Sequence, residues 1–163
     1  MCGIAGLIGR DDNPPDPLVL DRLAEALAHR GPDGRGRHVV GGIGLIQNRL
    51  SIIDLAGGRQ PILDAEGNAI VANGEIYNYR ELRAALPDQS FATGSDCEVP
   101  LHLFRRYGLD FVTHLRGMYA LAIHHRATNR VVLARDPFGI KPLYYAEGRW
   151  GLAFASEPAA LLA

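Results

Sequence analysis

The sequence predicts a layered α+β sandwich. Most of the chain is organised as short apolar runs of strand length, and a few helical patterns interrupt them. Several of these runs are apolar on both faces, which is typical of a sheet covered on one side by helices and on the other by a second sheet. The 163 residues are 47% hydrophobic and 21% charged, which fits one domain with a full core.

The elements can be predicted in order from the N-terminus. Residues 3–9 (GIAGLIG) are predicted to form a buried strand that ends at the turn-rich stretch RDDNPPDP. A helix follows, with Asp16-Pro17 at its start and Gly31-Pro32 at its end. The other strands are predicted at 38–46, 69–73, 117–124, 130–135, 142–146 and 150–155, and two more helices at about 77–86 and 97–107. The last residues, FASEPAALLA, predict the start of a helix with no polar tail, which is typical of a fragment or an excised domain.

Charge and composition exclude several classes of function. Seventeen Lys and Arg residues against eighteen Asp and Glu residues give a net charge of −1, so we expect no nucleic-acid or membrane partner. No apolar run approaches membrane-spanning length and no signal sequence is visible, so we expect a cytoplasmic protein. The two cysteines, Cys2 and Cys97, are then expected to be reduced. None of the six His residues has a metal-ligand spacing, and His124-His125 would point to opposite faces of a strand, so we expect no metal site.

Five short polar stretches stand out from the apolar surroundings. They are Cys2-Gly3, HRGPDG at 29–34, NRLSIID at 48–54, NGEIYNY at 73–79 and TGSDCE at 93–98. Each has a structural explanation when taken alone. RGPDG is a good turn sequence, TGSD a good helix N-cap, and Asn73-Gly74 a favoured hairpin turn.

Taken together, these stretches supply what is needed to attack the amide of an amino acid. Removal of Met1 would leave Cys2 with both a thiol and a free α-amine, and the amine can act as its base. Asn73 and the Gly74 N–H can donate to an oxyanion. Arg49 suits an α-carboxylate and Asp96 an α-ammonium, although the two could instead pair with each other.

Eight motifs resemble one family in order and in spacing. They are MCGIAG, HRGPD, RLSIIDL…QP, NGEIYNY, GSDCE, LRGMYALAI, RDPFGIKPLYY and FASE. The chain from Met1 to about Glu157 resembles the glutaminase domain of class II glutamine amidotransferases, and most of all the asparagine synthetase branch. The resemblance implies an N-terminal-nucleophile hydrolase fold, which is a four-layer αββα sandwich with two facing antiparallel sheets.

The resemblance also implies a reaction. Cys2 would attack the side-chain amide of L-glutamine, release ammonia and form a γ-glutamyl thioester that water hydrolyses to glutamate. Asn73 and Gly74 would form the oxyanion hole, while Arg49 and Asp96 would hold the substrate's α-carboxylate and α-ammonium. Four further residues would line the glutamine pocket: Leu50, Ile52, Ile53 and Glu75. Arg30 in HRGPD lies near that pocket in the family, with no catalytic step assigned to it.

Two departures from the family pattern limit the resemblance. Gln47 stands where the family often has His, and no Ser-Gly-Gly-x-Asp-Ser pyrophosphate loop occurs in the 163 residues. We therefore expect residues 1–163 to be the amidotransferase domain, with the C-terminal synthetase domain absent. No cofactor is expected for the glutaminase step, and ATP and Mg would be needed only in the synthetase domain. The expected protein partners are a synthetase domain, either C-terminal or separate, and a second copy in a homodimer.

Two other functions are compatible with the sequence. The domain could serve another ammonia acceptor, as in polysaccharide or peptide modification, with asparagine synthesis replaced by a different transfer. It could also be a module that binds glutamine without hydrolysing it. Cys97, at a predicted helix start, is expected to be an inert core residue.

Overall fold

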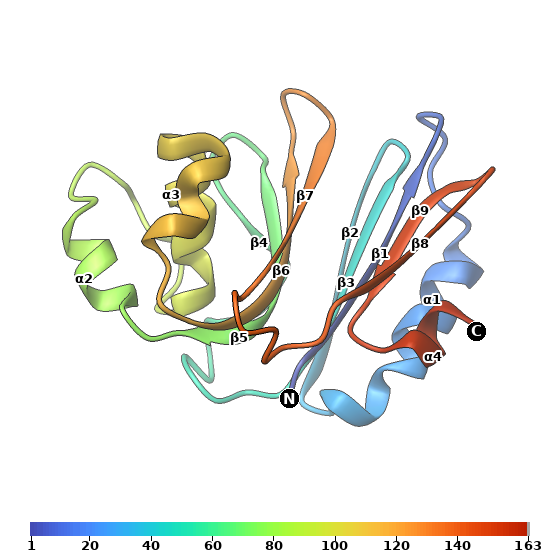
Figure 1. The fold of residues 1–163 in the computed structure, drawn as a ribbon, viewed down its shortest axis with the longest axis horizontal. Helices are drawn as coiled ribbons and strands as arrows, with labels where there is room; N and C mark the ends of the chain where they lie inside the picture. The colour runs from blue at the N-terminus through green and yellow to red at the C-terminus, as the bar shows by residue number, and fades with distance from the viewer. Residues whose placement is uncertain (163) are drawn as a thin grey trace.

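The computed structural model describes residues 1–162 and has four layers. Two antiparallel sheets face each other, and helices cover the outer face of each sheet (Figure 1). This arrangement confirms the predicted αββα sandwich. The N-terminus lies at the lower edge of the molecule in Figure 1, where the two sheets approach each other. Within residues 1–162, no helix is long and apolar enough to cross a membrane.

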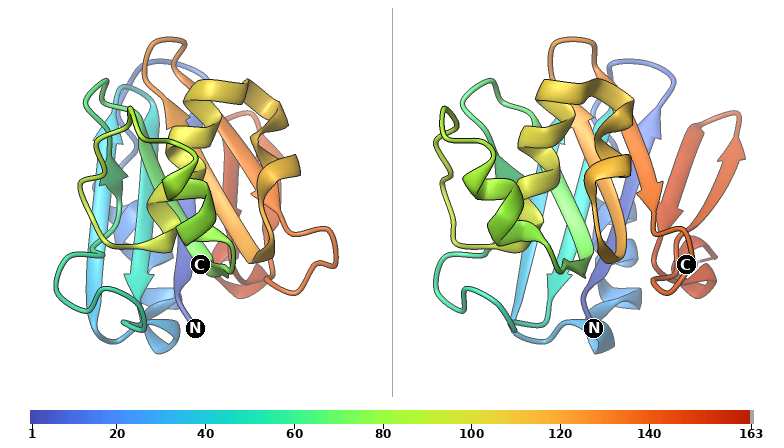
Figure 2. Two further views of the ribbon diagram at one scale, coloured as in Figure 1. Left: turned by 90° about the vertical axis from the view of Figure 1, so that its left-hand side faces the viewer. Right: turned by 60° about the vertical axis from the view of Figure 1, so that its left-hand side comes forward.

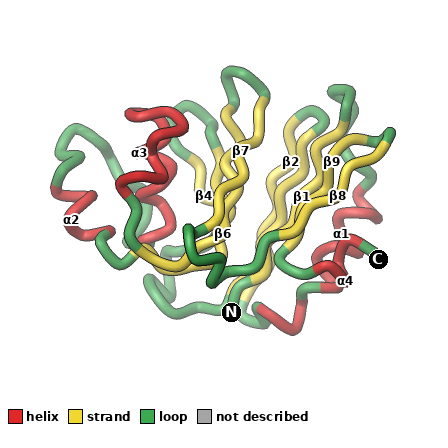
Figure 3. Tube along the Cα trace, viewed as in Figure 1, coloured by secondary structure: helices red, strands yellow, loops and turns green. Residues whose placement is uncertain are grey.

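The first sheet has five strands in the order β2-β3-β1-β9-β8. Helices α1 (Pro17–Ala26) and α4 (Pro158–Leu161) cover its outer face (Figure 3). Helix α1 begins as predicted, because the Asp16 carboxylate accepts a hydrogen bond of 2.9 Å from Leu18 N. The strands are β1 (Gly3–Gly9), β2 (Gly34–Val40), β3 (Ile43–Arg49), β8 (Tyr144–Gly148) and β9 (Gly151–Ala155).

The second sheet has four strands in the order β4-β5-β6-β7. Helices α2 (Tyr79–Ala84) and α3 (Val99–Tyr107) lie across its outer face, in front of the strands in the turned views (Figure 2). Two 3₁₀ segments, Asp96–Glu98 and Gly108–His114, flank α3; a third, Ala28–Arg30, follows α1. The strands are β4 (Ile62–Leu63), β5 (Ala69–Ile76), β6 (Gly117–His125) and β7 (Arg130–Arg135).

An apolar core fills the space between the two sheets. Ile4 and Leu45 from the first sheet pack with Val71 and Ala122 from the second, and all four are fully buried. Alternate residues of the same strands pack outward against the helices, which is why these strands are apolar on both faces. The sequence pattern that predicted the sandwich therefore reflects burial of both faces of each sheet, one against the other sheet and one against helices.

The predicted strand at 38–46 is wrong. The structure has two strands, β2 and β3, joined by a tight turn at Gly41-Gly42 in which Gly41 has φ 51°. The apolar run continues across this turn, so its pattern gives no sign of the reversal. Strand β4 and the 3₁₀ segment Gly108–His114 are also additions to the predicted elements.

Strand β5 is longer than predicted and contains Asn73-Gly74. These residues lie in the β5–β6 ladder, where Gly74 is paired with Tyr119, and do not form a hairpin turn. Glycine is required there by a close approach, because a Cβ at Gly74 would lie 2.3 Å from the carbonyl oxygen of Met118. The strand thus places the Asn73 side chain next to a main-chain segment at Gly74 that no side chain covers.

Candidate active site

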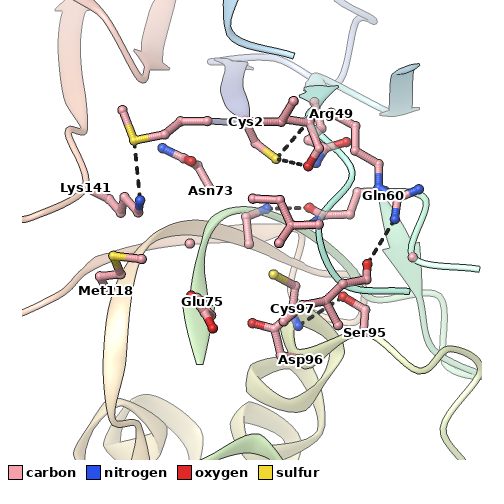
Figure 4. A pocket seen from close by; sticks show the side chains of 18 residues that line it. Cys2, Arg49, Gln60, Asn73, Glu75, Ser95, Asp96, Cys97, Met118 and Lys141 are labelled. Atoms are coloured by element: carbon pink, nitrogen blue, oxygen red, sulfur yellow. Dashed lines mark hydrogen bonds between the residues drawn. The ribbon is translucent and has the colours of Figure 1, made fainter. Parts of the chain in front are cut away.

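All nine predicted site residues line one pocket at the end of the sandwich where the N-terminus lies (Figure 4). The pocket lies between the end of β3 and the end of β5, so both sheets contribute to it. Cys2 and Arg49 lie on one side of it, and Asp96 and Cys97 on the other. The lining residues are Met1, Cys2, Gln47, Arg49, Leu50, Ile52, Ile53, Gly58, Gln60, Ala72, Asn73, Gly74, Glu75, Ser95, Asp96, Cys97, Met118 and Lys141.

The Cys2 thiol is held at the start of β1. Its Sγ atom lies 3.4 Å from the amide nitrogen of Leu50, which donates to it, and 3.5 Å from the carbonyl oxygen of the same residue. Arg30 donates from Nε to the Cys2 carbonyl oxygen at 3.0 Å, and its Nη1 lies 2.5 Å from a carboxylate oxygen of Glu157. The arginine of HRGPD therefore fixes the main chain of Cys2, although the sequence alone assigned it no step.

Three main-chain amides of β5 point away from β6 and toward the pocket. Ala72 N donates to the side-chain oxygen of Gln60 at 2.6 Å, and Ile76 N donates to Asp96 Oδ2 at 2.7 Å. Because N–H groups two residues apart on a strand point the same way, Gly74 N lies between these two in the same row. Gln60 and Asp96 accept from Ala72 N and Ile76 N, and neither accepts a hydrogen bond from Gly74 N. The Gly74 N–H thus faces the pocket between two occupied neighbours.

The Asn73 side chain provides a second donor in the pocket. Asn73 is 2% exposed, and its Nδ2 atom has no hydrogen-bond partner among the residues that the structure describes. A buried amide N–H without a partner is costly unless a ligand or a water molecule accepts its hydrogen bond. Asn73 therefore has the donor that an anionic oxygen bound beside Cys2 would require.

The Arg49 guanidinium is buried and is oriented by the loop that follows β3. Its Nη2 donates to the carbonyl oxygens of Asp54 at 2.6 Å and Ile53 at 3.2 Å, and its Nη1 donates to Leu55 O at 3.2 Å. All three acceptors are neutral carbonyls, so the positive charge stays available to an anion. Arg49 lies at the end of β3, where the strand leaves the sheet.

Asp96 is the first residue of the 3₁₀ turn before α3, as the N-cap pattern predicted. Ser95 caps this turn by accepting a hydrogen bond of 3.2 Å from Cys97 N. Burial raises the pKa of the Asp96 carboxyl, although the hydrogen bond from Ile76 N opposes this. Within residues 1–162 no ion pair joins Asp96 to Arg49, so each is available to a separate charge of a ligand.

The pocket also contains polar residues that were not predicted as site residues. Gln60 belongs to the QP pair of the motif quoted above, and Lys141 to RDPFGIKPLYY, so the signals were present without a role attached. Lys141 is buried, and its Nζ contacts Met1 Sδ at 3.4 Å. Gln47 is 1% exposed, and its Nε2 has no partner among the described residues. Gln47 therefore adds a second unpaired amide donor to the pocket wall.

Cys97 differs from Cys2 in its surroundings. It lies in the core between the second sheet and its helices and also touches the pocket. Burial raises the pKa of the Cys97 thiol well above its ordinary value, and the neighbouring Asp96 adds to this effect. Cys97 is therefore held as a thiol, which is the unreactive form.

Glu98 fixes the loop that leads to Asp96. It is buried, and its carboxylate accepts bonds of 2.7 Å from Ala92 N, Thr93 N and Thr93 Oγ1, while His102 Nε2 lies 3.2 Å away. Burial alone would raise the pKa of Glu98, but these hydrogen bonds outweigh it and lower the pKa to about 2. The loop from Ala92 to Ser95 is thus built around one ionised carboxylate.

We expect Glu98→Gln to destabilise the fold at pH 7 by about 1 to 3 kcal/mol, because an amide cannot accept all of these hydrogen bonds. Since the folded-state pKa is lowered, the carboxylate stabilises the fold above the ordinary Glu pKa of 4.5, and this contribution is lost as the pH falls toward 2. Urea unfolding of the wild-type protein and the variant from pH 7 to pH 3 should show that the difference between their unfolding free energies becomes smaller as the pH falls. A difference that stays constant with pH would contradict this role for Glu98.

No group of His, Cys, Asp and Glu within residues 1–162 could hold a metal ion. The pocket combines the Cys2 thiol with two unpaired amide donors, a buried arginine and a buried carboxyl. These are groups that bind and attack an organic substrate.

The sequence matches the family described as "Glutamine amidotransferase domain" over residues 1–163. The chain belongs to this family. The amidotransferase domain is 45% identical over 161 residues to asparagine synthetase [glutamine-hydrolyzing] 2 of Bacillus subtilis, covering 96% of the chain and 22% of the relative. It is 44% identical over 154 residues to asparagine synthetase [glutamine-hydrolyzing] of Triphysaria versicolor, covering 93% of the chain and 26% of the relative. The predicted family is therefore confirmed, and the chain spans about a quarter of these relatives' length.

Solved structures share the fold of this amidotransferase domain. Glutamine phosphoribosylpyrophosphate amidotransferase from B. subtilis superimposes with a TM-score of 0.79 at 24% identity, covering 98% of the chain and 43% of that protein. A structure described as the allosteric regulatory enzyme of purine biosynthesis gives a TM-score of 0.77 at 25% identity, with the same coverage. The first likeness, below 25% identity, concerns the fold alone. Together they confirm the expected N-terminal-nucleophile hydrolase fold.

Proposed function

We propose that this domain hydrolyses L-glutamine to glutamate and ammonia, with Cys2 as the nucleophile. The observation that carries the proposal is the pocket itself. The Cys2 thiol opens into the same pocket as the unpartnered Asn73 amide, the buried Arg49 guanidinium and the buried Asp96 carboxyl. Glutamine has a matching set of groups, namely a side-chain amide, an α-carboxylate and an α-ammonium.

The reaction begins when Cys2 Sγ forms a bond to the amide carbon of glutamine. The α-amine of Cys2, free once Met1 has been removed, takes the thiol proton and passes it to the leaving nitrogen. Asn73 Nδ2 and Gly74 N donate to the oxyanion of the tetrahedral intermediate. The carbon–nitrogen bond then breaks and ammonia leaves. Water adds to the thioester, the carbon–sulfur bond breaks, and glutamate is released with the thiol restored.

Substrate recognition is assigned to the walls of the pocket. Arg49 would bind the α-carboxylate and Asp96 the α-ammonium, which fixes the orientation of the amino acid. The side chains of Leu50, Ile52 and Ile53 would cover the methylene groups of glutamine, with Glu75 beside them. Ile52 is exposed in the structure, so its contact would form when the substrate binds.

The assay that tests the proposal measures glutamate and ammonia from L-glutamine. The two products should appear in equal amounts and at equal rates. A protein that binds glutamine in calorimetry but releases neither product would be the binding module, and the hydrolase proposal would fail.

Loss of Met1 is a separate prediction of this mechanism. Intact-mass measurement of the purified protein should give a mass lower by one methionine residue, because the α-amine of Cys2 is the proposed base. A sample that retains Met1 should be inactive, and treatment with methionine aminopeptidase should activate it. Activity in a sample that keeps Met1 would rule out the amine as the base.

The whole protein is proposed to be an asparagine synthetase in which a C-terminal synthetase domain uses the ammonia. This rests on the names of the relatives and on their length, of which the chain covers 22% and 26%. ATP and Mg would be required only for that second step, with aspartate as the acceptor. Another acceptor is the second candidate, because one relative has a name other than asparagine synthetase: amidase chry2 from Gibberella zeae matches at 38% identity over 178 residues. Asparagine formation by the full-length protein from aspartate, glutamine and ATP would decide between them.

A further inference from the structure

Two loops, one after a strand and one between helices, form the rim of the pocket. One joins β3 to β4 and covers residues 50–61; the other joins α2 to the 3₁₀ turn before α3 and covers residues 85–95. A hydrogen bond of 2.8 Å connects them, from Gly94 N to Asp54 Oδ2. Asp54 is the last residue of the NRLSIID stretch. The sequence motifs assign it no role, and it is not among the residues that line the pocket.

Asp54 contacts Arg49 and the loop that carries Asp96 through different atoms. Its main-chain carbonyl accepts the 2.6 Å bond from Arg49 Nη2, which is the shortest of the three bonds made by that guanidinium. Its side chain binds Gly94, two residues before Asp96. The position of Asp54 therefore couples the group proposed for the α-carboxylate to the loop that carries the group proposed for the α-ammonium.

The local geometry shows why an aspartate suits this position. Asp54 has φ 51°, a left-handed conformation that Asp, Asn and Gly tolerate better than other residues. Its Oδ1 accepts a bond of 2.9 Å from Gly57 N, so its two oxygens bind two different amides. An asparagine could adopt the same backbone, but only one of its two terminal atoms is an acceptor. The turn alone needs only Oδ1, which accepts from Gly57 N. The second acceptor, Oδ2, binds Gly94 N in the other loop.

We propose that Asp54 is a positioning residue for glutamine, because it sets the spacing between Arg49 and Asp96. The inference rests on the proposed function and adds a residue to it. Asp54 does not line the pocket, so it acts on binding of the two α-groups and leaves the reaction at Cys2 unchanged.

Asp54→Asn tests this inference in the purified domain. KM for glutamine should rise by about 10-fold, the scale of one lost charge-assisted hydrogen bond, with kcat within about twofold. Iodoacetamide has no α-groups, so Cys2 should be alkylated at the wild-type rate in the variant. The glutamine concentration that protects Cys2 from alkylation should rise by the same 10-fold.

Asp64→Asn is the matched control. Asp64 also binds main-chain amides of its own turn, Glu66 N and Asn68 N at 2.9 Å each, and it is not among the pocket residues. It should change thermal stability but neither KM nor glutamine protection. An equal rise in KM in this control, or an unchanged KM in Asp54→Asn, would overturn the inference.

A second variant keeps the test valid if Asp54→Asn does not fold. A Cβ at Gly94 would lie 3.3 Å from Asp54 Oδ2, so Gly94→Ala should displace the Asp54 carboxylate by a few tenths of an ångström while keeping both bonding groups. It should raise KM in the same way, and wild-type KM in this variant would also count against the role of Asp54. Failure of the wild-type domain to release ammonia would instead overturn the proposed function, so the two failures are distinguishable.

Discussion

Replacing Cys2 with Ala should reduce ammonia release from glutamine to the background rate, a loss of roughly 10⁴-fold or more. The variant removes the sulfur that forms the covalent bond, and no second nucleophile in the pocket is activated in the same way. The measurement is glutamate formation under saturating glutamine, together with calorimetry of glutamine binding. Binding should persist in the variant, because the groups proposed to hold the substrate are unchanged.

Cys97→Ala is the control for this experiment, since Cys97 borders the same pocket. Burial raises the pKa of its thiol well above the ordinary value, so it should not act as a nucleophile. The variant should keep kcat within about twofold and lose some stability, because it leaves a small cavity in the core. Equal activity in the two variants would remove Cys2 from the mechanism. Full inactivation by Cys97→Ala would mean that the essential thiol is that of Cys97.

The fold could be predicted well where the signal was local. The Asp16 cap of α1, the Ser95 cap before α3 and the apolar run of β6 all follow from neighbouring residues. His124 and His125 were expected on opposite faces of a strand. In the structure, His124 contacts His38 of the facing sheet, and His125 packs on the ring of Phe104.

Strand β2 could not be predicted over residues 34–37, although its ladder partner β3 follows directly after the turn at Gly41-Gly42. Its residues GRGRHVV include two arginines whose side chains pair with carboxylates of α1, Arg35 with Glu25 and Arg37 with Asp21. β2 is an edge strand and presents these charges outward, so it lacks the apolar alternation that indicates a strand. In the structure, the antiparallel ladder with β3 identifies it.

The candidate site shows a similar division. The side chains that carry chemistry have distinctive identities, and all nine predicted residues line the pocket. What the sequence could not indicate is the row of main-chain amides on β5, because an N–H direction has no residue signature. Gln60 and Asp96 take the amides of Ala72 and Ile76 where β4 no longer pairs with β5. The Gln60 side chain thus accepts the hydrogen bond that a neighbouring strand would otherwise accept, because β4 does not extend as far as Ala72.

The oxyanion donors give the second large prediction. Asn73→Ala should lower kcat by about 10² to 10³, equivalent to roughly 3 to 4 kcal/mol of transition-state stabilisation. KM should change little, since the amide would bind the charge that develops in the intermediate and the α-groups are held elsewhere. Asn73→Asp should be at least as damaging, because a carboxylate would repel the oxyanion.

Asn48→Ala provides the matched control for Asn73→Ala. Asn48 is also buried, but its side chain points to the outer face of the sheet and donates to Ala24 O at 2.6 Å. Losing this bond should lower the unfolding free energy by about 1 to 3 kcal/mol and leave kcat nearly unchanged. Steady-state kinetics and urea unfolding on both variants separate the two effects. If Asn73→Ala raised KM and left kcat intact, its unpaired amide would serve binding of the ground state, and the oxyanion would depend on the Gly74 N–H.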